Sequence, residues 1–158
     1  MGGLSSAAFY GAGKAVEALK RGFYRRNSKY TLYRRTQNIG EFSQLEEVMS
    51  LRNVKRVARK AGINYDGIKI SIDRNPELIK REYFGYTWPS GRKVTLYPRA
   101  FENRETLVKT LGHERIHVYQ VRLFGPPTTD EMAKMFEAAA YESKEYWWNY
   151  YKYLNGGR

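Results

Sequence analysis

The chain has 158 residues, and its apolar content of 42% and charged content of 28% are ordinary for a globular protein. This length predicts a single domain, residues 1–158, with one sizeable core. No apolar stretch is long enough to cross a bilayer, and residues 1–20 lack the pattern of a signal peptide. The chain contains no cysteine, which leaves its redox compartment and its localisation open.

The net charge of +12 is unevenly distributed along the chain. Residues 1–62 hold 13 Lys and Arg against 4 Asp and Glu, a net +9, whereas residues 63–158 hold 15 against 12, a net +3. Such an excess is typical of proteins that bind nucleic acid, an anionic membrane or an acidic protein. A basic surface that only keeps the protein soluble has the same composition, so charge alone does not decide between these interpretations.

Residues 1–62 are predicted to form a basic, mainly helical N-terminal part. Spacing of small and apolar residues predicts a helix over residues 5–21 and a second over 41–61, with Gly62 ending the second. A short strand is expected over residues 30–33. Cations crowd the last turns of the second helix, where the helix dipole favours them even without a ligand.

Residues 63–158 are predicted to supply a sheet and two further helices. Alternating apolar and polar residues predict a strand over 68–72. Two aromatic or β-branched runs, 82–88 and 93–97, predict a hairpin with its turn at 89–92. The sequence therefore favours an α+β domain, with helices packed on a short, mostly antiparallel sheet.

The third predicted helix begins after Asn103, whose side chain can cap it, and ends at Gly125-Pro126-Pro127. Gly112 lies inside it and lowers its helix propensity; the glycine either allows another element to approach closely or is a tolerated defect. A capping box over residues 128–131 opens the C-terminal helix, which ends in an aromatic run over 146–154.

Both histidines of the chain lie in the third predicted helix, at His113 and His117, with Glu114 directly after the first. Residues four apart share one face of a helix, so the two imidazoles can hold one Zn²⁺ while Glu114 takes a proton from the metal-bound water. This His-Glu-x-x-His pattern is typical of zinc peptidases. The alternatives are two solvated histidines or a structural zinc site, and the lack of cysteine disfavours the latter.

A third protein ligand is expected from the C-terminal helix. Glu137 follows His117 by 20 residues, which leaves room for the chain to turn at the prolines and return antiparallel. Catalytic zinc sites commonly combine two histidines with one glutamate, so Glu137 is the first candidate and Glu142 the second. Glu137 could equally be a solvated helix charge.

The set of His113, Glu114, His117 and Glu137 resembles the gluzincin branch of the zincin metallopeptidases. Residues 112–120, Gly-His-Glu-x-x-His-Val-x-Gln, are similar to zinc-peptidase domains of bacterial polymorphic toxins and contractile injection systems. The resemblance covers residues 103–145 and implies a zincin-like fold that holds a peptide substrate as an added strand at a sheet edge near the metal. Thermolysin-like gluzincins carry Glu-x-x-x-Asp at the third ligand, whereas Tyr141 stands at the last position here.

The function expected from these residues is zinc-dependent hydrolysis of a peptide bond. Tyr141, one turn after Glu137, is the first candidate for stabilising the oxyanion. Further candidates for this role are Tyr119, Tyr146 and Arg115. The resemblance implies a secreted effector domain, delivered into a target cell and paired with an acidic immunity protein. The alternative is a basic nucleic-acid-binding protein with a secondary or structural metal site.

Overall fold

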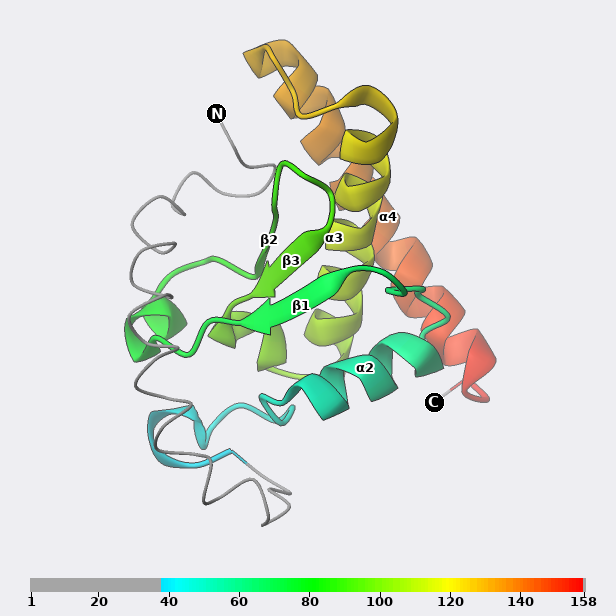
Figure 1. The fold of residues 1–158 in the computed structure, drawn as a ribbon. Coiled ribbons are helices and arrows are strands. Elements are labelled where there is room, and N and C mark those ends of the chain that lie inside the picture. Colours follow the sequence, from blue (N-terminus) through cyan, green and yellow to red (C-terminus); the bar gives the residue numbers. More distant parts are fainter. Residues whose placement is uncertain (1–37, 158) are drawn as a thin grey trace.

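The computed structural model describes residues 38–157, which form an α+β fold (Figure 1). Within these residues the α-helices are α2 (Leu51–Lys60), α3 (Arg104–Phe124) and α4 (Asp130–Leu154). The strands are β1 (Lys69–Ile72), β2 (Gly85–Thr87) and β3 (Lys93–Leu96). Three short 3₁₀-helices join them: η1 (Gly40–Phe42), η2 (Pro76–Lys80) and η3 (Pro98–Phe101). The helix expected over 5–21 and the strand expected over 30–33 lie outside the described residues.

The sheet is mixed, so the expectation of a mostly antiparallel sheet is wrong. Its strand order is β1-β3-β2, with β3 parallel to β1 and antiparallel to β2. The predicted hairpin is confirmed: Gly91 adopts a φ of 67° and its N–H donates to the carbonyl of Trp88 at 2.9 Å. Hairpin pairing is set locally, whereas β1 reaches the other side of β3 only through a crossover that contains η2 and β2.

The second predicted helix is shorter than its sequence pattern indicates. Only residues 51–60 are α-helical, because Ser50 caps the helix by accepting a hydrogen bond from the N–H of Asn53. The side chain of Asn38 bonds to the backbone of Leu45, Glu47 and Met49 and holds the preceding segment outside the helix. Leu45 and Met49 are buried although they lie in this non-helical segment. Their spacing resembles that of a helix, which is why the sequence pattern predicted one from residue 41 onward.

Helix α3 begins and ends at the residues predicted from the sequence, whereas the cap of α4 differs by one residue. Asn103 caps α3 by accepting from the N–H of Thr106 at 2.8 Å, and Gly125, at a φ of 78°, ends it. The cap of α4 is Thr129, not the first threonine of the predicted capping box: its Oγ1 accepts from the N–H of Met132 at 3.1 Å. No helix of residues 38–157 is long and apolar enough to cross a membrane.

Helix α3 is buried between the sheet on one side and α4 on the other (Figure 1). The contacts run in opposite directions along the two helices, since Gln120 bonds to Phe136 whereas Lys109 pairs with Glu145. The helices are therefore antiparallel. Apolar side chains of α2, α3, β1 and β3 meet in one core. Its fully buried members include Val54, Val57, Val94, Leu96, Phe101, Leu107, Val108, Leu111 and Val118.

Gly112 allows α4 to approach α3 closely, which decides between the two sequence-based interpretations of this glycine. A Cβ atom at position 112 would lie 2.2 Å from Cδ1 and 2.3 Å from Cγ of Trp147. Non-bonded carbon atoms do not approach one another so closely, so any side chain here would force the indole to move. The approach sets the distance between α3 and α4 at the residue directly before His113.

We expect Gly112→Ala to destabilise the protein by about 1–3 kcal/mol, because overpacking against Trp147 outweighs the roughly 1 kcal/mol that alanine gains in a helix. Urea unfolding followed by circular dichroism measures this change. In a Trp147→Ala background the same substitution should be neutral or stabilising, since the clash is gone. Equal destabilisation in both backgrounds would contradict the packing explanation.

Candidate metal centre

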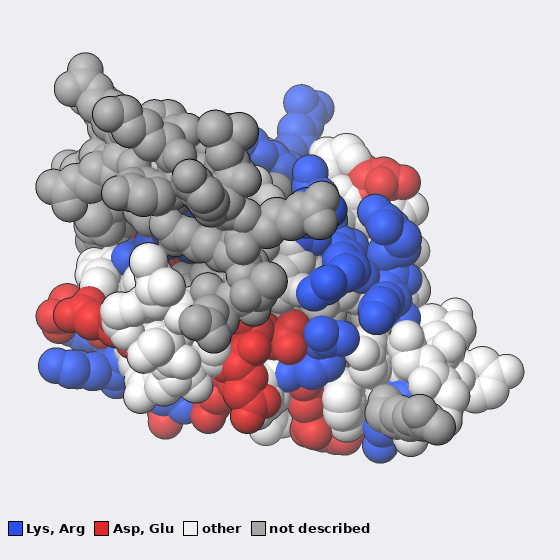
Figure 2. All heavy atoms as spheres, turned by 90° about the horizontal axis from the view of Figure 1, so that it is seen from below, with Lys and Arg blue, Asp and Glu red and all other residues white. Residues whose placement is uncertain are grey.

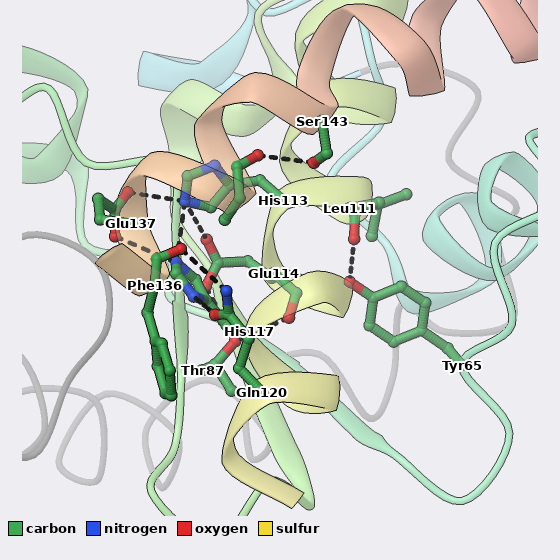
Figure 3. Close-up of polar contacts among 11 residues, drawn as sticks. Tyr65, Thr87, Leu111, His113, Glu114, His117, Gln120, Phe136, Glu137 and Ser143 are labelled. Atoms are coloured by element: carbon green, nitrogen blue, oxygen red, sulfur yellow. Dashed lines mark hydrogen bonds and ion pairs between the residues drawn. The ribbon is translucent and has the colours of Figure 1, made fainter. Parts of the chain in front are cut away.

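Three side-chain groups from two helices converge at one point (Figure 3). His113 and His117 lie one turn apart on α3, and their Nε2 atoms are 3.1 Å apart. Glu137 on α4 places Oε1 2.8 Å from His113 Nε2 and Oε2 3.1 Å from His117 Nε2. Both histidines are buried, and the carboxylate of Glu137 is about half-buried. The candidate ligand atoms all lie within 4.8 Å of one another, so this group could hold one metal ion.

Gln120 fixes the orientation of His117 through a chain of two hydrogen bonds. Its amide nitrogen donates to the carbonyl of Phe136 at 3.0 Å, which leaves its Oε1 facing His117 Nδ1 at 2.8 Å. Because an amide oxygen can only accept, Nδ1 of His117 carries the proton. Nε2 is then the nitrogen that faces His113 and Glu137, and once it has lost its proton its lone pair is available to a metal ion. The same amide ties α3 to the residue directly before Glu137.

Glu114 lies beside the ligand group but is held separately from it. Its side chain is 2% exposed, and Thr87 of β2 donates a hydrogen bond to Oε1 at 3.0 Å. Oε2 lies 3.8 Å from His113 Nε2. A Cβ atom at Gly85 would lie 2.9 Å from Cγ of Glu114, so β2 packs directly on this carboxylate. The sheet thus fixes one oxygen and leaves the other facing the histidines.

The pKa values in the centre are shifted in the directions that its burial and pairing require. Burial raises the pKa of Glu114, although the two histidines and Thr87 oppose that effect. Burial would also raise the pKa of Glu137, but hydrogen bonds from His113 and His117 outweigh it and lower the pKa to about 2. Burial would lower the pKa of His117, yet Glu137 and Glu114 raise it above its ordinary value. Glu137 is therefore ionised at neutral pH, as a metal ligand must be.

The donor set and its spacing fit zinc. Two imidazole nitrogens and one carboxylate oxygen form a common protein ligand set for a catalytic Zn²⁺. A tetrahedral zinc ion with ligands at about 2.0–2.2 Å needs neighbouring ligand atoms about 3.3 Å apart. The two Nε2 atoms are 3.1 Å apart, close to that spacing, and each lies 2.8 Å or 3.1 Å from a different oxygen of Glu137. A rotation of the half-exposed Glu137 carboxylate would let one of its oxygens face both histidines.

The structure brings His113, Glu114, His117 and Glu137 together, as the sequence predicts, and places the remaining candidates elsewhere. Glu142 is exposed and lies about 140° around α4 from Glu137. The three tyrosines considered for oxyanion stabilisation are all exposed to solvent: Tyr119 by 58%, Tyr141 by 66% and Tyr146 by 61%.

Tyr141 keeps its predicted place one turn beyond Glu137, with its ring centroid 4.9 Å from Nζ of Lys144. Arg115 is engaged elsewhere, because its Nε donates to the carbonyl of Asn64 at 2.7 Å. Whether Tyr141 stabilises an oxyanion stays a prediction.

The roles of two further residues were not predicted from the sequence, although Gln120 belongs to the motif of residues 112–120. Gln120 is three residues after His117 and hence on the same helix face, a spacing that could have indicated its role. Lys144 is two turns after Glu137, and burial lowers its pKa while Glu114 and Glu137 act to raise it. Its ammonium group is thus within electrostatic reach of both carboxylates, a relation that depends on how α3 and α4 pack.

Comparisons with protein-family models, curated proteins and solved structures found no match to this chain. The geometry of the centre and the chemistry of its residues therefore have to support any functional conclusion.

The ligand set predicts which glutamate of α4 is needed for metal binding. Glu137→Ala should weaken zinc binding by more than about 100-fold, because even losing a partner that only orients a ligand costs about 10- to 100-fold. Competition of the purified protein with a chromophoric zinc chelator measures the affinity. Glu142→Ala removes the same charge from the same helix and should leave the affinity unchanged. Equal losses in the two variants would contradict the assignment of Glu137.

Proposed function

We propose that this protein is a zinc-dependent metallopeptidase. The observation that carries the proposal is the convergence of His113, His117 and Glu137 beside a second carboxylate, the buried Glu114, which does not belong to the ligand group. A structural metal site needs no such group, whereas hydrolysis needs a proton acceptor next to the ion. The two roles are divided between two glutamates with opposite pKa shifts.

Zinc, when bound, would supply a Lewis acid that acidifies a water molecule and polarises a substrate carbonyl. Glu114 accepts the proton of the attacking water at Oε2, since Thr87 already occupies Oε1. Its raised pKa brings it closer to neutrality, where a carboxylate accepts and returns a proton most effectively. After attack on the peptide carbonyl, Glu114 delivers this proton to the leaving amine. Gln120 keeps His117 in the tautomer that the ion needs throughout.

The biological setting that we propose is the effector domain of a secreted bacterial toxin. Support comes from the resemblance of residues 112–120 to zinc-peptidase domains of such toxins and from the net charge of +12. A basic surface suits an acidic immunity protein, because complementary charge speeds association. Expression in a bacterial host should then be toxic, and the toxicity should depend on the residues of the metal centre.

Glu114→Gln separates catalysis from metal binding. We expect this variant to bind zinc as the wild type does, because Glu114 is not a ligand, but to lose at least about 100-fold in peptide hydrolysis. Zinc content after purification and cleavage of a denatured protein mixture, followed by mass spectrometry, measure both properties. The same substitution should abolish toxicity in the bacterial host. Retained hydrolysis would remove Glu114 from the mechanism.

A second candidate function, nucleic-acid binding, is favoured by one arrangement on the surface. The exposed face of α2 carries five cations that no described carboxylate pairs with: Arg52, Lys55, Arg56, Arg59 and Lys60. Figure 2 shows Lys and Arg gathered in a band on the side of the molecule that carries α2. Three tyrosines of α4 stack next to this helix: Tyr146 and Tyr150 at 6.0 Å, and Tyr150 and Tyr153 at 6.5 Å.

The two helices are joined at these ends, since Asn155 donates to the carbonyl of Lys60 at 3.0 Å. Cations beside stacked aromatic rings are the ordinary surface for single-stranded nucleic acid.

Salt dependence tests this second function. The affinity for a single-stranded 20-mer should fall steeply between about 50 and 200 mM salt. Arg59→Glu/Lys60→Glu should weaken binding and lower the log–log salt slope by about 0.7 for each phosphate that the variant no longer neutralises. Lys80→Glu/Arg81→Glu makes the same charge change at an exposed site outside α2 and should have a smaller effect. No retention of the wild type on the oligonucleotide at low salt would exclude the function.

A further inference from the structure

A cleft of about 400 Å³ opens between α3, α4 and the residue before β2, and its lining includes residues one helical turn from Glu114 and from Glu137. Its lining includes Phe84, Thr110, Tyr141 and Lys144, none of which is a candidate metal ligand. A volume of this size is within the range of ligand sites and can hold an amino-acid side chain. The cleft is therefore large enough to contribute to substrate recognition.

The cleft adjoins the residues proposed to act on the peptide bond. Thr110 is one turn before Glu114 on α3, and a Cβ atom at Gly85 would touch both of these side chains, at 3.2 Å and 2.9 Å. Phe84 is the residue directly before Gly85 and lines the cleft at this junction of strand and helix. Tyr141 is one turn after Glu137 on α4. A side chain in the cleft would thus lie within a residue or two of the scissile bond.

Of the two lysines that line the cleft, Lys109 forms ion pairs and Lys144 does not form one with any described residue. Nζ of Lys109 pairs with Glu105 at 2.7 Å and with Glu145 at 2.5 Å, so one cation and two carboxylates form a cluster whose members are paired with one another. Lys144 has no ion pair with any described residue; its Nζ faces the ring centroids of Tyr141 at 4.9 Å and Phe84 at 5.8 Å. One ammonium group between two aromatic walls is thus left for a ligand.

The environment of Lys144 suits an anionic partner. Burial lowers the pKa of its ammonium group, which means that the charged form lacks full hydration. An incoming carboxylate restores this missing stabilisation through a charge-assisted hydrogen bond, and screening by water is weaker than on an open surface. The rings of Phe84 and Tyr141 offer apolar contact to the methylene groups that precede such a carboxylate.

We propose that this cleft is a substrate subsite that accepts an acidic side chain, Asp or Glu, with Lys144 as the residue that determines specificity. The inference rests on the proposed peptidase function and names the substrate class of the same centre. A bound acidic side chain places its carboxylate at Lys144 and its backbone toward Glu114 and the metal ligands. The protein then cleaves peptide bonds at a fixed distance from an acidic residue.

Cleavage of a proteome-derived peptide mixture, read by mass spectrometry, tests the subsite. The wild type should select Asp or Glu about tenfold or more at one fixed position relative to the cut. Lys144→Glu should reverse this preference toward Lys and Arg at the same position; the preference is read as a ratio among peptides cut by the same variant, so that a change in its overall activity cancels. Lys134→Glu, an exposed lysine of the same helix, should keep the acidic preference. An unchanged profile in Lys144→Glu, or selection of aromatic residues instead, overturns the proposal.

A binding measurement separates this inference from the function on which it rests. Two zinc-loaded proteins, the single variant Glu114→Gln and the double variant Glu114→Gln/Lys144→Glu, are each applied to an immobilised random peptide array. Enrichment of acidic peptides that depends on Lys144 supports the subsite even if the wild type cleaves nothing, an outcome that would reject the peptidase function alone. If the single variant Glu114→Gln, which keeps Lys144, does not enrich acidic peptides, the subsite proposal is overturned, whatever the cleavage result.

Discussion

The arrangement on which the structure depends is the close meeting of three electron-rich groups in its interior. Nε2 of His113 and Nε2 of His117 face each other at 3.1 Å, and the carboxylate of Glu137 lies 2.8 Å and 3.1 Å from them. Lone pairs repel at these distances unless a positive charge, a proton or a metal cation, lies among them. Helices α3 and α4 therefore enclose a group that is stable only with a cation. This requirement links their packing to the chemistry of the centre.

The packing that brings α3 and α4 together is specific and directional. Gly112 lets the indole of Trp147 approach the backbone of α3, which fixes the spacing of the helices on one side of the histidines. Gln120 fixes it on the other side by bonding both to His117 and to the carbonyl before Glu137. His117 is oriented by a neutral amide, Gln120, on its own helix. A neutral partner adds no charge, so Glu114 and Glu137 remain the only carboxylates of the described residues that act directly on the cation.

The sequence predicted the centre better than the sheet, and the reason is physical. His113, Glu114 and His117 are related by a helical turn, and caps such as Asn103 and Gly125 act on their nearest neighbours, so local rules suffice. Glu137 could be chosen because a short connection between the helices forces an antiparallel return. The parallel pairing of β1 with β3 depends on a crossover whose path no local pattern encodes. The role of Lys144 could not be predicted for a similar reason. It depends on burial and on neighbours from other elements, whereas lysine is ordinarily a solvated residue.

Helix α4 carries both proposed functions, but on opposite faces. Glu137, Tyr141 and Lys144 are spaced by four and three residues and form one stripe, which faces the metal centre and the cleft. The stacked Tyr146, Tyr150 and Tyr153 have the same spacing but begin nine residues after Glu137, about 180° around the helix. A ligand at the cleft therefore does not cover the tyrosines, and a partner on the tyrosines and α2 leaves the metal centre accessible. Since the two surfaces share a helix without sharing a side chain, the two proposed functions do not exclude each other.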